Sequence, residues 1–218
     1  MLPLGDATRP PSRFPVVTIS IIALNVVVFL LELAGGDQFV TQWSLVPADV
    51  VAGRHLATLL TAMFMHASWL HIIGNMMFLW AFGPQIEVAM GPGRYAVFYL
   101  LGGIASAFAQ IAIDPASTIP NLGASGAIAA VMGAFLVTYP RDKIRTVLFF
   151  GWFYRIAFIP AAVLIGLWFL LQLVDFGVIA DVHSGGVAYM AHIGGAIFGA
   201  VTARLFERSE QVGAFERF

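Results

Sequence analysis

Five polar side chains that could take part in chemistry stand inside long apolar stretches of this 218-residue sequence: Ser125, His192, His71, Asn75 and His66. A serine hydroxyl becomes a nucleophile when an imidazole within hydrogen-bond reach accepts its proton. His192 is the candidate base for Ser125. These residue types together favour acyl transfer through a serine nucleophile.

Acyl transfer also needs hydrogen-bond donors for the oxyanion of the tetrahedral intermediate. His71 and Asn75 are four residues apart, so they share one face of a helix. Ser125 follows Pro120 and Gly123, which predicts that it opens a helix and that its backbone N–H is free. We therefore expect His71, Asn75 and the N–H of Ser125 to form the oxyanion site.

Each residue also has a structural interpretation. A lone serine between glycines is commonly a helix-packing residue, and a lone histidine in a membrane is commonly a hydrogen-bonded structural group. No Asp or Glu lies beside His192 in its apolar stretch, so the pattern predicts a dyad rather than a triad.

Metal and aspartyl chemistry fit the sequence less well. There is no cysteine and no His-Glu-x-x-His motif, and the apolar stretches contain no Asp. His66 is five residues before His71, which would turn the two about 140° apart on an ideal helix. We predict neither a metal nor a cofactor, and we give His66 the weaker claim to the site.

The elements that position these groups are predicted to be membrane helices. Hydrophobic residues make up 60% of the chain and charged residues 11%, which excludes an ordinary water-soluble domain. Six uncharged stretches reach the roughly 18 residues that a spanning helix needs. They are residues 14–31, 55–86, 95–113, 115–140, 156–174 and 182–203. The sequence predicts an all-α membrane protein with a six-transmembrane-helix bundle.

Basic residues mark the cytoplasmic side of such a bundle. Ten of the 11 Lys and Arg residues fall on one side of the six predicted spans, and only Arg54 falls on the other. Both termini are therefore expected in the cytoplasm. At 1.5 Å per residue, Ser125 and His71 would each lie about 24 Å from the cytoplasmic ends of their helices, and His192 about 18 Å. All three would meet in the outer half of the bilayer.

The remaining segments divide the chain into three parts. We expect a cytoplasmic N-terminal tail at residues 1–15 without a removable signal peptide, a six-span domain at 16–205 and a cytoplasmic C-terminal tail at 206–218. Residues 35–58 could be an interfacial segment or a plain loop. Likewise, Val182 to Val187 could be a mobile cap over the site or a plain loop.

Three motifs together resemble the rhomboid family of intramembrane serine proteases. They are His66-Ala-Ser-Trp-Leu-His71-Ile-Ile-Gly-Asn75, Gly123-Ala-Ser125-Gly126 and Ala191-His192-Ile-Gly-Gly195-Ala-Ile-Phe-Gly199. Gly83, Glu87 and Gly91 are similar to the family's short cytoplasmic turn after the second span. Residues 25–205 carry the resemblance, which implies a rhomboid-like bundle with a Ser125–His192 dyad.

Two positions depart from the family pattern. A Trp-Arg pair before the second span is here Ala57-Thr58, and an aromatic residue that often stacks on the catalytic histidine is here Ala129. Another aromatic residue such as Tyr189 could fill the space beside His192.

The resemblance implies a serine endopeptidase that cleaves peptide bonds in or near transmembrane helices through an acyl-enzyme. Its expected partners are transmembrane protein substrates and membrane lipids, in the inner (plasma) membrane. The net charge of −1 and the lack of a nucleic-acid-binding motif argue against nucleic acid, and the sequence indicates no oligomeric state. The rival hypotheses are a non-catalytic binder of client helices and a small transporter or channel.

Overall fold

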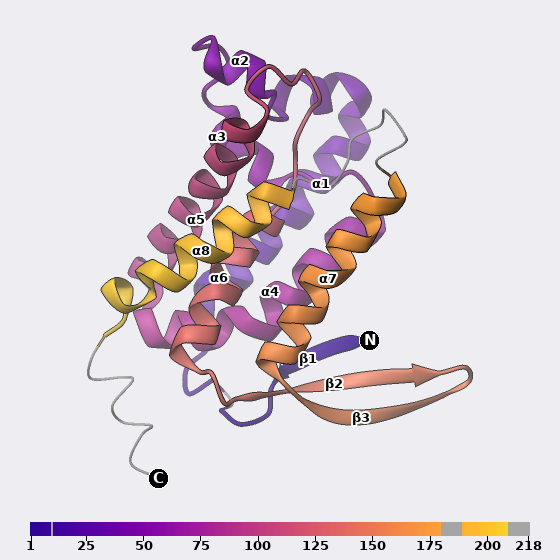
Figure 1. Ribbon diagram of the computed structural model, residues 1–218, viewed down its shortest axis with the longest axis vertical. Coiled ribbons are helices and arrows are strands. Elements are labelled where there is room, and N and C mark those ends of the chain that lie inside the picture. The colour runs from indigo at the N-terminus through magenta and orange to yellow at the C-terminus, as the bar shows by residue number, and fades with distance from the viewer. Residues whose placement is uncertain (10, 180–188, 209–218) are drawn as a thin grey trace.

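The computed structural model describes residues 1–9, 11–179 and 189–208, with side chains omitted for 171–179. Most of the chain is helical (Figure 1). The helices are α1 (Val16–Trp43), α2 (Pro47–Val51), α3 (Thr58–Thr61), η1 (Ala62–Phe64), α4 (Trp69–Met90), α5 (Pro92–Ile113), α6 (Ser125–Thr138), α7 (Ala161–Ile179) and α8 (Tyr189–Phe206). The strands are β1 (Leu2–Asp6), β2 (Lys143–Phe150) and β3 (Phe153–Pro160).

Six long helices, α1 and α4 to α8, each overlap one of the six uncharged stretches. Within the described residues, α1 and α5 alone combine the length and hydropathy of a membrane-spanning helix. α6 and the Ala161–Leu170 part of α7 are apolar but shorter. The structure therefore contains two clear apolar spans within a larger helical bundle.

α1 is longer than predicted. It continues past Glu32, where the charge had suggested the end of the span, and reaches Trp43 through a non-helical residue, Gly36, at φ 58°. Glu32 is buried within the bundle, so its charge does not mark a helix end. The segment 35–58, which was expected to be an interfacial segment or a loop, is largely helix in the structure.

An antiparallel sheet in the order β1-β2-β3 was not predicted. The fifth span had been placed directly after Arg155, the last charge before an apolar stretch, but β3 continues to Pro160 and α7 starts only at Ala161. β-Branched and aromatic residues favour strands here. Gly151 accepts φ 64° at the first position of the two-residue turn between the strands.

α4 also runs further than predicted. Glu87 was placed in a turn, but it lies in the last turns of α4, and the chain reverses only at Gly91, at φ 78°. The Glu87 side chain is buried and accepts hydrogen bonds from the backbone N–H groups of Val17 (2.8 Å) and Thr18 (2.7 Å). Because the first N–H groups of a helix have no partner within it, Glu87 caps α1 from a different helix.

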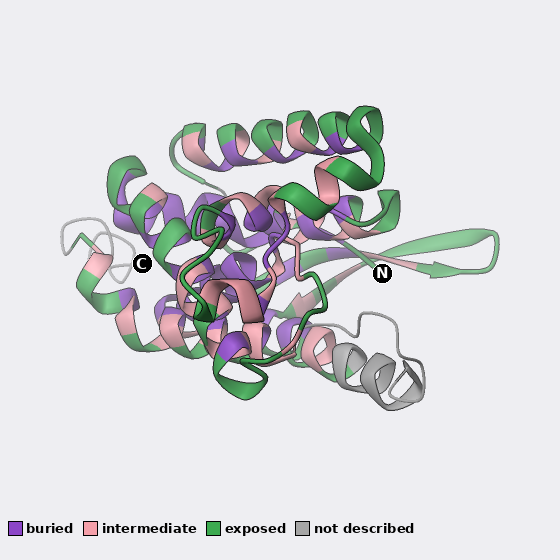
Figure 2. Ribbon diagram, turned by 90° about the horizontal axis from the view of Figure 1, so that it is seen from above, coloured by how far each residue is buried: buried purple, intermediate pink, exposed green. Residues whose placement is uncertain are grey.

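α6 is the centre of the bundle and is buried on nearly all sides, where it packs against α4, α5 and α8 (Figure 1). Figure 2 shows how the buried residues gather toward the middle of the bundle. Glycines allow α8 to approach it closely. A Cβ added to Gly195 would collide with the carbonyl group of Gly126, and one added to Gly199 would collide with that of Ala130. Small residues at such crossings are how membrane helices pack when lipid supplies no hydrophobic driving force between them.

We predict that Gly199→Ala lowers the melting temperature of the protein in detergent. The added methyl group overlaps the Ala130 carbonyl, and overpacking of this kind costs about 1–3 kcal/mol. The matched control is Gly166→Ala on α7, where a Cβ would meet no atom within 4 Å and where alanine favours a helix. Equal melting temperatures for the two variants would contradict the close packing of α6 and α8.

Candidate active site

Ser125 and His192 lie within hydrogen-bond distance of each other. Ser125 is the first residue of α6, His192 lies in the first turn of α8, and the distance between Oγ and Nε2 is 2.6 Å. His192 is 3% exposed, whereas Ser125 is only partly buried. The pair therefore has the contact that general-base activation of a serine requires, with the hydroxyl accessible at one end of the bundle.

The other ring nitrogen of His192, Nδ1, has no hydrogen-bond partner among the described side chains. Asp175 is in the part of α7 whose side chains are not described, and Asp181 lies outside the described residues. The proposed cap, Val182 to Val187, also lies outside them. The described part of the site thus consists of a serine–histidine pair.

The start of α6 presents free backbone donors near Ser125. The residue before it, Ala124, offers no side-chain cap, so the first N–H groups of α6 are not satisfied by one. Gly123 has φ 138°, which L-residues rarely adopt, and its N–H donates to the Ala62 carbonyl at 2.9 Å. Gly123 thereby connects the turn before Ser125 to the segment before α4.

His71 faces this turn from α4. A Cβ added to Gly123 would lie 3.0 Å from Nε2 of His71 and 3.6 Å from Oγ of Ser125, so only glycine leaves room between them. The backbone N–H of Ala67 donates to Nδ1 of His71 at 3.4 Å. In the neutral tautomer that this contact favours, the proton is on Nε2, where it faces the Ser125 side of the site.

Asn75 lies one turn further along α4 and is 8% exposed. Its Nδ2 has no hydrogen-bond partner in the part of the chain that the structure describes. Buried amide donors are usually hydrogen-bonded, so this donor is available to an acceptor that enters the site.

His66 is nearer the site than predicted. α4 begins at Trp69, with Ser68 as its N-cap, so His66 precedes the helix and the expected 140° separation from His71 does not apply. The two imidazole rings meet edge to face with centroids 5.0 Å apart. His66 is buried, and its backbone N–H donates to Glu32 at 2.9 Å. Glu32 thus holds the backbone of His66, and the His66 ring packs against the ring of His71.

Trp168 of α7 occupies the space that Ala129 leaves beside His192. Its ring centroid is 5.0 Å from that of His192, at an interplanar angle of 57°. Sequence analysis expected another aromatic residue beside His192 and gave Tyr189 as an example; it did not name Trp168. No local pattern marks Trp168, because its contact depends on how α7 packs against α8.

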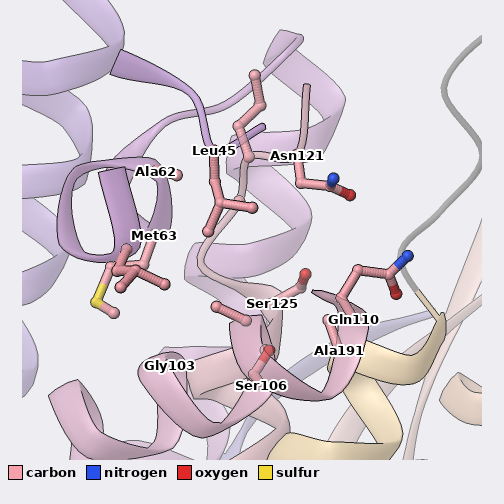
Figure 3. Close-up of a pocket in the computed structure, with 14 residues that line it drawn as sticks. Leu45, Ala62, Met63, Gly103, Ser106, Gln110, Asn121, Ser125 and Ala191 are labelled. Carbon is pink, nitrogen blue, oxygen red and sulfur yellow. The ribbon is translucent and has the colours of Figure 1, made fainter. Parts of the chain in front are cut away.

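A small pocket opens beside Ser125 (Figure 3). Its volume is about 60 Å³, and its walls are mostly small and apolar, with Ser106, Gln110 and Asn121 among the polar groups. Ala62, Met63, Gly103 and Ala191 line it as well. A volume of this size has room for a small side chain or a few water molecules.

Comparison with known proteins places this chain in a family. The Rhomboid domain family matches residues 53–209. The chain belongs to the rhomboid family. Rhomboid protease GluP from Bacillus subtilis is 32% identical over 126 residues, which cover 56% of this chain and 24% of that protein.

Two further relatives come from other organisms. Mitochondrial Rhomboid protein 1 from Saccharomyces cerevisiae is 26% identical over 189 residues, covering 84% of this chain and 51% of that protein. Rhomboid protease GlpG from Yersinia pestis is 29% identical over 129 residues, covering 59% of this chain and 45% of that protein. The chain thus spans about a quarter to a half of the length of these relatives. This rhomboid protein is a membrane protein with apolar helices.

We predict that Trp168→Ala slows the reaction of Ser125 with a fluorophosphonate by about 2- to 10-fold, since an aromatic pair contributes about 0.5–1.5 kcal/mol. Trp168→Phe keeps a ring beside His192 and should retain most of the rate. The control is Trp80→Ala on α4, which removes a largely exposed indole. An unchanged rate in Trp168→Ala would show that the ring does not position His192.

Proposed function

We propose that this rhomboid protein is an intramembrane serine endopeptidase that cleaves peptide bonds in or near the transmembrane helices of membrane proteins. The observation that carries the proposal is the 2.6 Å contact between Ser125 Oγ and His192 Nε2, on two helices held together by glycines. The relatives named as rhomboid proteases support it.

In this mechanism His192 takes the proton of Ser125 as Oγ attacks the scissile carbonyl carbon. The histidine then gives that proton to the leaving amine, and an acyl-enzyme on Ser125 remains. A water molecule, deprotonated by the same histidine, hydrolyses the ester and releases the second product. No carboxylate is assigned to His192, so a dyad performs both steps.

The oxyanion would be stabilised by three donors. The N–H of Ser125 lies at the start of α6, where the helix dipole also favours negative charge. His71 presents Nε2 toward the nucleophile's turn, and Asn75 has an amide donor that is buried without a partner among the described residues. An occupied oxyanion site would give these donors an acceptor.

The pocket beside Ser125 suggests which peptide bonds fit. With about 60 Å³ between mostly small residues, it suits a small side chain next to the cleaved bond. A bond inside a helix is shielded by the helix itself, so a substrate must unwind locally. Residues with poor helix propensity, such as Gly, should make that unwinding easier.

The proposed setting is the bacterial inner membrane, with all six long helices spanning it and both termini in the cytoplasm. The chain has ten basic residues on the predicted cytoplasmic side. Four of them lie at residues 141–155, at the sheet end of the bundle, whereas Ser125 lies at the opposite end of α6. The active site would therefore open toward the outer face.

Orientation can be tested because the chain has no cysteine. A membrane-impermeant maleimide should label Val51→Cys, on an exposed position of α2, in intact cells. It should label Gly93→Cys, in the exposed first turn of α5, only after the membrane is opened. The reverse pattern would overturn the proposed orientation.

The dyad predicts the outcome of a second experiment. A fluorophosphonate should label the wild-type protein, and both labelling and cleavage of a transmembrane substrate should fall by at least about 10³-fold in Ser125→Ala and His192→Ala. The matched control is Ser106→Ala, which removes the hydroxyl of another serine that lines the same pocket. Melting temperatures show whether each variant is folded.

Two outcomes would contradict this mechanism. Continued cleavage by Ser125→Ala would exclude the serine as the nucleophile. Substrate binding without cleavage or labelling in the wild-type protein would instead favour the non-catalytic binder.

A further inference from the structure

The β2–β3 hairpin carries exposed aromatic side chains on both of its faces. We define its tip as residues 148–155. The last cross-strand pair of β1 is Leu2 with Val147, so the tip extends beyond β1 and consists of two strands only. Trp152, in the turn, is 98% exposed, and four further aromatic residues flank it at half exposure or more: Phe149, Phe150, Phe153 and Tyr154.

The cross-strand register places these residues on opposite sides. Phe149 pairs with Tyr154 on one face, and Phe150 pairs with Phe153 on the other. The rings of Phe150 and Phe153 stack at a centroid distance of 5.9 Å. Two-stranded ribbons are marginally stable in water, and contiguous exposed apolar surface indicates an interaction site. The tip therefore needs an apolar environment around it rather than a partner on one face.

The location of the hairpin indicates what that environment is. The hairpin connects the end of α6 to the start of α7, so its base is at the end of the helical bundle. It then projects sideways past α7 and across the direction of the bundle (Figures 1 and 2). In a membrane protein, the ends of the helices lie at the level where hydrocarbon meets headgroups, and Trp and Tyr are enriched there.

The charges of the same segment complement an anionic lipid surface. Arg141, Lys143, Arg145 and Arg155 are all exposed. The one acidic residue of this segment, Asp142, is buried and pairs with Arg9 at 2.8 Å. Basic side chains next to a membrane are attracted to phosphatidylglycerol-type headgroups. Aromatic residues at the tip and basic residues around them thus match the two layers of a lipid interface.

We propose that residues 148–155 insert sideways into the lipid leaflet at the sheet end of the bundle. The aromatic side chains lie at the boundary between headgroups and acyl chains, and the basic side chains bind lipid phosphates. The proposal rests on the membrane placement in the proposed function, but it requires no catalytic activity. A second copy of the chain fits less well, because pairing at the β3 edge would cover backbone groups and leave both aromatic faces exposed.

A nitroxide label tests this insertion in the full-length protein. Since the chain has no cysteine, Trp152→Cys gives a single labelling site, and Ala7→Cys is a control at an exposed position next to the same sheet. In nanodiscs of phosphatidylcholine and phosphatidylglycerol, we expect the label at 152 to be severalfold more accessible to oxygen, relative to a water-soluble nickel complex, than the label at 7. Equal ratios at the two positions would overturn the proposal.

Two further measurements distinguish contact with lipid from contact with a second chain. The ratio of oxygen to nickel accessibility at position 152 should be unchanged in nanodiscs that hold a single chain. It should also be unchanged in the Ser125→Ala background, which distinguishes loss of catalysis from loss of insertion. In Arg155→Glu, which reverses the charge at the tip, the label at 152 should become more accessible to the nickel complex, because the glutamate is repelled by lipid phosphates. Protection that appears only with two chains in a disc would assign the surface to a second copy and overturn the proposal.

Discussion

The close contact between the backbones of α6 and α8 determines the rest of the site. Serine and histidine have short side chains, so their 2.6 Å contact requires the two helices to be almost in van der Waals contact. The chain achieves this with Gly195 and Gly199 against α6, and with Gly133, whose added Cβ would collide with the carbonyl group of Ala196. In lipid, where apolar side chains gain little by meeting one another, this close packing also holds the bundle together.

The candidate site could largely be predicted from the sequence because its polar residues are costly in a membrane and are carried by short motifs. Their depths along the predicted spans placed Ser125, His71 and His192 at one level, and the structure brings Ser125 and His192 into contact. Trp168 could not be predicted, since its contact depends on the packing of two helices. The prediction that His66 faces away from His71 was wrong. The N-cap at Ser68 starts α4 later than the uncharged stretch suggested, so His66 precedes the helix and its ring contacts that of His71.

The fold was less predictable where charged residues were used to place the ends of the membrane-spanning helices. Charged residues usually end membrane spans, yet Glu32 and Glu87 are buried inside the bundle and accept backbone N–H groups. Each has a positioning role: Glu32 holds the segment before α4, and Glu87 holds the start of α1. The sheet was missed for a related reason. After Arg155, an apolar strand and an apolar helix follow each other without a charge between them.

The pairing of β1 with β2 has a consequence for how the protein is made. Leu2 leaves the ribosome long before its strand partner, Val147, is synthesised. At roughly 5–20 residues per second, β1 waits on the order of ten seconds for β2. During that time α1, α4, α5 and α6 can enter the membrane and pack. β1, which is translated before the helices, thus joins the fold late, when it pairs with the connection between α6 and α7.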